Sequence, residues 1–171
     1  MPGSPTDARP PVGESASAAV SVADYLWFAD LALGGMTRIV DDLGDELANR
    51  RPPIAGVNTP YAILTHCLGV LEYWGGATVA GRSIERDRAA EFTASGPVAP
   101  LLERAAAAQR RLADDLVGLD SWGEPSSVRR DPEDPVPYSE TKGAVLLHIL
   151  EELFQHLGQL EITRDALRAQ P

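Results

Sequence analysis

The chain has 171 residues, 44% of them hydrophobic and 23% charged, which is typical of a single soluble domain that buries a substantial core. Its 15 Lys and Arg residues and 25 Asp and Glu residues give a formal net charge of −10. This charge argues against nucleic-acid or anionic-membrane partners, because both require a cationic face.

The sequence also lacks the features of membrane and secreted proteins. No apolar run reaches the roughly 18 residues that a membrane-spanning helix requires. The first residues lack the basic-then-apolar order of a signal peptide. The one cysteine, Cys67, excludes an internal disulfide framework and fits a reducing compartment. We therefore expect a cytoplasmic protein.

The chain begins with a segment that has no hydrophobic period. Residues 1–20 are rich in Pro, Gly, Ser and Ala, and this predicts a flexible N-terminal arm ahead of a folded domain at 21–171. From Val22 to about Ala48, apolar residues recur at a spacing of three to four and predict an amphipathic helix. The Gly34-Gly35 pair within it predicts a kink or a close contact with a neighbouring helix.

A second helix follows a loop at 49–57 and has clear start signals. Asn58 or Thr59 is placed to cap the first turn, and the helix itself is predicted from Pro60 to about Ala80. Proline suits the first helical position because its missing N–H would have no partner there. The polar, arginine-rich residues 81–96 then predict a connection on the surface.

Two further elements complete the predicted fold. A third helix is expected from Pro97 to Leu119, followed by a long loop with a short strand or hairpin around Ser126–Arg130. Ser139 is placed to cap a fourth helix, from Glu140 to about Leu167. Four helices of similar length predict an all-α four-helix bundle with a long crossover before the last helix.

The three histidines of the chain lie on predicted helices. Glu152 and His156 are four residues apart and therefore share one face of the fourth helix, while His66 lies midway along the second. Two imidazoles and one carboxylate can hold a divalent cation and leave one position open. Bundles build metal sites in this way, from facing helices. The alternatives are a hydrogen-bonded core histidine and a solvated Glu–His pair.

Three segments resemble one known family. Residues 64–74, LTHCLGVLEYW, resemble the second-helix motif of the DinB-like superfamily, in which a Glu and a Trp follow a metal-binding His. Residues 86–92, RDRAAEF, are similar to the connection after that helix in the mycothiol-transferase branch. Residues 148–159, HILEELFQHLGQ, resemble the last helix of the same branch. The resemblance covers roughly Val22 to Arg168.

The resemblance implies a ligand set and a cofactor. The family's metal ligands fall on His66, Glu152 and His156, and a carboxylate at the middle position is similar to the mycothiol-dependent transferases and isomerases. Gln155 and Gln159 stand where the branch often has Arg and a further His, which concerns the substrate pocket. The implied cofactor is a divalent metal, Zn²⁺ first and Ni²⁺ or Fe²⁺ as alternatives, with mycothiol as co-substrate.

These features predict a metal-dependent thiol S-transferase. A low-molecular-weight thiol would be activated as a metal-bound thiolate and would attack an electrophilic substrate, in detoxification or in biosynthesis. A non-catalytic metal-binding module for stress response or ligand sensing remains open, as does a thiol-dependent isomerase. Because such isomerases commonly carry a domain after the bundle and this chain ends at Pro171, we expect transfer. Related bundles often pair, so a homodimer is among the expected assemblies.

Other residues have weaker claims to a role. His148, one turn before Glu152, is placed to orient a metal-binding side chain without contacting the metal itself, although packing in the core is the commoner role of such a histidine. Three arginines are candidates to receive a carboxylate or sugar hydroxyls of the thiol, the alternative being a solvated basic loop: Arg82, Arg86 and Arg88. Cys67 follows His66 but points about 100° around the helix, which predicts a buried structural thiol.

Overall fold

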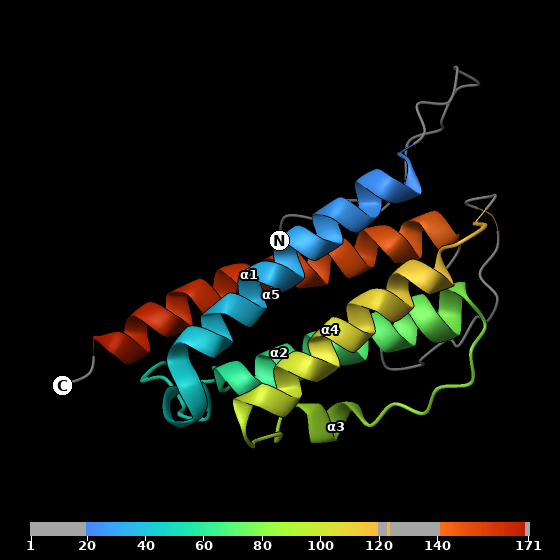
Figure 1. Cartoon of the computed structure of the whole chain (residues 1–171). Coiled ribbons are helices and arrows are strands. Elements are labelled where there is room, and N and C mark those ends of the chain that lie inside the picture. The colour runs from blue at the N-terminus through green and yellow to red at the C-terminus, as the bar shows by residue number, and fades with distance from the viewer. Residues whose placement is uncertain (1–19, 120–122, 124–140, 170–171) are drawn as a thin grey trace, which may run out of the picture.

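The computed structural model describes residues 20–119, 123 and 141–169, and within them the regular elements are all helices. The long elements form the predicted all-α bundle (Figure 1), which confirms the fold class: α1 (Val22–Ala48), α2 (Pro60–Val70) continued by the π-helical segment η1 (Leu71–Val79), α4 (Val98–Asp115) and α5 (Lys142–Arg168). A short helix, α3 (Arg88–Glu91), precedes α4. The predicted arm, apart from Val20, and the predicted strand at Ser126–Arg130 lie outside the described residues.

The bundle consists of two pairs of helices; the two helices within each pair are parallel, and the pairs run in opposite directions (Figure 1). Helices α1 and α5 run side by side in one direction, and α2 and α4 run in the other (Figure 1). The ring of Phe28 contacts that of Phe154 with centroids 6.4 Å apart. Further along both helices, a Cβ added at Gly35 would lie 2.8 Å from Leu157 Cδ1. A close helix contact at the glycine pair, one of its two predicted outcomes, is therefore confirmed. The kink in α1 lies instead at Gly44, whose φ is +63°.

The hydrophobic core lies between the helices, and it determines which face of each helix is turned inward. Each fully buried aliphatic side chain contributes about 1.5–3 kcal/mol through removal of apolar surface from water. The side chains at the centre of this core come from every long helix: Met36, Leu64, Leu68, Leu101, Ile149 and Leu153. In the described part of the chain, no helix has the length and apolar character needed to cross a membrane.

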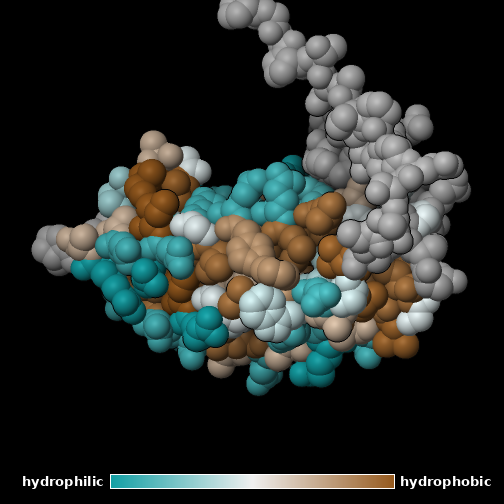
Figure 2. Space-filling view, turned by 90° about the horizontal axis from the view of Figure 1, so that it is seen from above, coloured by the Kyte–Doolittle hydropathy of each residue, from teal (hydrophilic) through white to brown (hydrophobic). Residues whose placement is uncertain are grey.

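Some large apolar side chains remain on the surface of the bundle. Six of them lie on α1 and α5: Trp27, Phe28, Leu31, Leu147, Phe154 and Ile162. Figure 2 shows brown residues lying among teal ones on the side of the molecule that is uppermost in Figure 1. Nothing in the described structure identifies what covers these side chains, so the homodimer stays a prediction.

Capping residues explain where the helices begin. The Thr59 side chain accepts a hydrogen bond from the backbone N–H of Ala62 at 3.2 Å, which confirms the predicted start of α2. At α5 the prediction was wrong by two residues. Thr141 rather than Ser139 caps this helix, because its side chain accepts from the N–H of Ala144 at 3.1 Å. The end of α4, predicted at Leu119, comes at Asp115.

The connection between η1 and α4 runs the length of the bundle. Because α2 and α4 are parallel, the chain must return from the end of η1 to the start of α4, and residues 80–97 do so (Figure 1). This crossover segment carries α3, which packs against α2. The long connection predicted before the last helix falls mainly outside the described residues. The connection predicted on the surface at 81–96 consists of exposed and half-buried residues, with the exception of Glu91, whose side chain is buried.

Candidate metal centre

Three side chains from two antiparallel helices converge at the middle of the bundle. Helix α2 supplies His66, and α5 supplies Glu152 and His156. The Nε2 atom of His66 lies 3.2 Å from Oε2 of Glu152, and the Nε2 atom of His156 lies 3.4 Å from the same oxygen. One metal-ligating atom from each residue lies within 4.8 Å of the others. The structure therefore brings together the three residues that the sequence singled out.

The three side chains differ in their access to solvent. His66 is 3% exposed, whereas the side chains of Glu152 and His156 are 26% and 22% exposed. The imidazole of His66 thus forms the buried wall of the site, and the two residues of α5 form its accessible edge. Two of the three side chains are therefore partly exposed to solvent.

The hydrogen bonds of the two imidazoles assign their tautomers. His66 Nδ1 lies 2.9 Å from Oε2 of Glu91, and His156 Nδ1 lies 2.8 Å from Oε1 of Gln159. Both partners are acceptors, so each Nδ1 carries a proton and donates it. The Nε2 atoms are the ring nitrogens that face Glu152, and they would offer their lone pairs to a cation bound there. Metal-bound histidines are usually held in this arrangement by their other ring nitrogen.

The electrostatics of the site favour a positive charge at its centre. Burial works to lower the pKa of His66, but the carboxylates of Glu152 and Glu91 outweigh burial and raise it. Hydrogen bonds from His156 and His66 hold the pKa of Glu152 well below its usual range. Two nitrogen lone pairs and a carboxylate facing one another repel unless a proton or a cation lies between them. The donor set therefore fits a divalent cation.

Glu91 is held in place by an arginine on the same crossover segment. Arg86 Nε donates to Glu91 Oε1 at 2.7 Å, and Arg86 Nη2 donates to Oε2 at 2.9 Å. Against the cost of burial, hydrogen bonds from His66 and Arg86 keep the pKa of Glu91 below its usual value. The sequence analysis missed Glu91. It gave Arg86 as a candidate for thiol binding or as part of a solvated basic loop, and in the structure Arg86 pairs with the Glu91 carboxylate.

The family model of the DinB superfamily matches residues 30–160, a span that contains all three converging residues. The chain belongs to the DinB superfamily. Proteins of this superfamily are often metal-binding and include metal-dependent enzymes, in agreement with the geometry of the site. No curated protein matches the sequence at a significant level.

The two remaining candidate arginines of this DinB-superfamily chain contact residues other than the three that converge. Arg82 Nη2 donates to Oδ2 of Asp115 at 2.8 Å. The guanidinium of Arg88 lies 5.6 Å from the ring centroid of Phe92. Phe92 in turn stacks on His66 with ring centroids 4.7 Å apart. Of the three arginines, Arg88 is therefore the exposed one on the crossover segment beside the site, whereas Arg82 and Arg86 are engaged with carboxylates.

His148 and Cys67 occupy structural positions near the centre. His148 Nδ1 lies 3.3 Å from Oε2 of Glu151, and its ring meets Trp74 edge-on with centroids 5.2 Å apart. A role for His148 in orienting a ligand stays a prediction. Cys67 is fully buried, and burial raises the pKa of its thiol. The prediction of a buried cysteine is confirmed.

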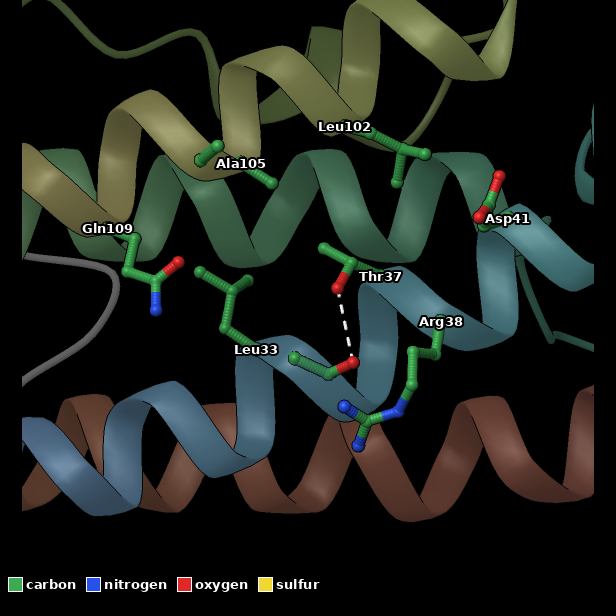
Figure 3. Close-up of a pocket in the computed structure, with 9 residues that line it drawn as sticks. Leu33, Thr37, Arg38, Asp41, Leu102, Ala105 and Gln109 are labelled. Carbon is green, nitrogen blue, oxygen red and sulfur yellow. Dashed lines mark hydrogen bonds between the residues drawn. The ribbon is translucent and has the colours of Figure 1, made fainter.

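A separate groove lies between α1 and α4. Its lining includes Leu33 and Thr37 of α1 and Leu102 and Gln109 of α4 (Figure 3). Thr37 Oγ1 donates to the carbonyl oxygen of Gly34 at 3.1 Å. None of the three converging residues lines this groove. The metal centre and the groove are therefore independent features of the bundle.

Proposed function

We propose that this DinB-superfamily protein is a metal-dependent thiol S-transferase. The observation that carries the proposal is the convergence of His66 Nε2, His156 Nε2 and Glu152 Oε2, two of whose side chains are partly exposed to solvent. Three protein ligands with an accessible side are typical of catalytic rather than structural zinc sites. A purely structural site would more often be closed by a fourth side chain.

The chemistry of the site suits a thiol co-substrate. A divalent cation held by these residues would bind the sulfur of a thiol and lower the pKa of that thiol, so that thiolate forms at neutral pH. Among the residues that would hold the cation, Glu152 contributes the one negative charge, and His66 and His156 would bind through uncharged imidazoles. Glu91 is balanced by Arg86. The centre therefore retains a net positive charge that favours an anion.

The resemblance of the second and last helices to the mycothiol-transferase branch supports mycothiol as the thiol. Arg88 is the arginine best placed to contact polar groups of this thiol, because it is exposed and lies over Phe92, whose ring stacks on His66. Zn²⁺ fits two imidazoles and one carboxylate well, and Ni²⁺ or Fe²⁺ fit the same donors.

The direct test is a conjugation assay. Purified protein is loaded with Zn²⁺ and mixed with mycothiol or glutathione and an aryl chloride, and thioether formation and chloride release are followed. In this reaction the sulfur bonds to the ring carbon, chloride leaves, and the thiol proton passes to buffer. We expect turnover with mycothiol that a chelator abolishes. Turnover should also disappear in Glu152→Gln and persist in the matched control Glu151→Gln, whose side chain is 54% exposed.

Two outcomes of this assay would contradict the proposal, and each would support a different function. Stoichiometric metal binding without thioether formation above the uncatalysed rate, for either thiol, would support a non-catalytic metal-binding module. If a thiol-dependent isomerisation of an unsaturated diacid is catalysed while the aryl chloride is not consumed, the protein is an isomerase. Mass spectrometry separates these results, because an isomerised product keeps its mass, whereas the thioether gains the mass of the thiol less that of HCl.

A further inference from the structure

The crossover segment delivers a carboxylate to the buried edge of His66. Glu91 is 7% exposed, and its Oε2 atom lies 2.9 Å from the Nδ1 atom of His66. On the opposite edge of the same ring, Nε2 faces Glu152. The ring face packs on Phe92, with an interplanar angle of 26°. The imidazole is thus contacted on both edges and on one face.

A glycine on α2 makes room for this carboxylate. Gly69 lies three residues after His66 and therefore on the same side of the helix. A Cβ added at Gly69 would lie 2.0 Å from Glu91 Oε1 and 2.6 Å from Glu91 Cδ, distances that no pair of non-bonded atoms tolerates. The missing side chain is therefore what allows Glu91 to reach the ring.

An ion pair and a helix cap fix the orientation of the carboxylate. Arg86 donates to both oxygens of Glu91, which leaves one lone-pair direction of Oε2 facing the imidazole. The backbone of this stretch is held by Asp87, whose side chain accepts from the N–H of Ala90 at 2.9 Å and starts α3. The position of Glu91 therefore depends on several independent contacts.

We infer that Glu91 is a positioning residue for the metal ligand His66. By accepting a hydrogen bond from Nδ1, Glu91 favours the tautomer that leaves Nε2 free to bind a cation beside Glu152, and it raises the basicity of that nitrogen. Gly69 and Arg86 serve this placement. The inference rests on the metal site of the proposed function and is independent of whether that site transfers a thiol.

A merely structural role for the Arg86–Glu91 pair would make different predictions. In that case its loss would loosen the crossover segment, and any other contact that anchors the segment would matter equally for the metal. Arg82 and Asp115 form such an anchor at the other end of the crossover, with an N···O distance of 2.8 Å. Asp115→Ala removes it without touching His66, so this variant is the matched control.

The test is a Co²⁺ titration of the metal-free full chain, followed by calorimetry and by the visible absorption of the bound ion. We expect Glu91→Ala to weaken Co²⁺ binding by roughly 10- to 100-fold and to shift the visible bands, because the ligand field at His66 changes. Glu91→Gln, which keeps one acceptor oxygen, should retain more affinity than Glu91→Ala. Asp115→Ala should match the wild type in both affinity and spectrum.

The possible results distinguish failure of the positioning role of Glu91 from failure of the metal site itself. Failure of the wild-type chain to bind Co²⁺ would remove the metal site, and the proposed function with it. Binding by the wild type with the same affinity and spectrum in Glu91→Ala would overturn the positioning role alone. Equal losses in Glu91→Ala and Asp115→Ala would also overturn it, in favour of a loosened segment. Far-ultraviolet circular dichroism of each metal-free variant confirms that the bundle is folded.

Discussion

The side-chain carbonyl of Gln159 accepts a hydrogen bond from the imidazole of His156 at 2.8 Å, one turn further along α5. This contact orients the second imidazole as Glu91 orients the first, but through a neutral and more accessible partner. Gln159 stands where the branch that the sequence resembles often has a histidine.

Replacing Gln159 by alanine is expected to weaken metal binding by roughly tenfold, because His156 loses the acceptor that fixes its tautomer. The matched control is Gln155→Ala on the same helix. Gln155 Nε2 donates to Glu151 Oε1 at 2.8 Å on the exposed surface, so its loss should leave the dissociation constant unchanged. Competition with a chromophoric chelator measures both constants. Equal affinities for the two variants would show that the contact to Gln159 has no role.

Gly69→Ala should lower the affinity for metal while changing the free energy of unfolding only slightly. An alanine in the middle of a helix is about 1 kcal/mol more favourable than glycine, but its Cβ would displace the Glu91 carboxylate. Because these effects oppose each other, we expect a small change in the free energy of unfolding and a metal affinity lowered by roughly tenfold. Urea denaturation and metal titration measure the two quantities.

Gly158→Ala is the control for this substitution. A Cβ at Gly158 would have no neighbouring atom within 4 Å, although the residue lies on α5 close to the metal centre. We expect this variant to gain up to about 1 kcal/mol of stability and to keep the wild-type metal affinity. If Gly69→Ala bound metal as tightly as Gly158→Ala does, the space beside Glu91 would have no functional meaning.

Tyr25→Phe is expected to stabilise the protein. Tyr25 is 2% exposed, burial raises the pKa of its hydroxyl, and the hydroxyl oxygen has no hydrogen-bond partner in the described structure. A buried polar group without a partner costs about 1–3 kcal/mol, so its removal should raise the free energy of unfolding by about 1 kcal/mol. Urea denaturation checks this value. A loss of 1 kcal/mol or more would mean that the hydroxyl is bonded in solution.

Local signals in the sequence were sufficient for the long helices. Thr59 and Pro60 mark the start of α2. The three-to-four spacing of apolar residues predicts which face of each long helix is buried. The local signals fail where two similar residues compete, as at the start of α5. Ser139 and Thr141 are both good capping residues, and only the three-dimensional path of the chain decides between them. The π-helical segment η1 was not predicted either, because its side-chain pattern continues that of α2.

The candidate site also contains residues that the sequence predicts and one that it does not. The approach of Glu152 and His156 follows from a spacing of four residues on one helix, and the contribution of His66 follows from antiparallel packing of α2 on α5. Glu91 could not be found by these rules, because it is a charged residue in a polar connection. The available signals were weak: Asp87 as a helix cap just before it, and a glycine three residues after His66.

The decisive measurement for the metal site is the metal content of the purified chain after loading with Zn²⁺ and dialysis. We predict one divalent ion per chain in the wild type and in Glu151→Gln, and loss of the ion in His66→Ala and Glu152→Gln. The two glutamates are neighbours on α5, but only Glu152 faces both imidazoles. A wild-type chain without bound metal, or an ion retained in Glu152→Gln, would contradict the account.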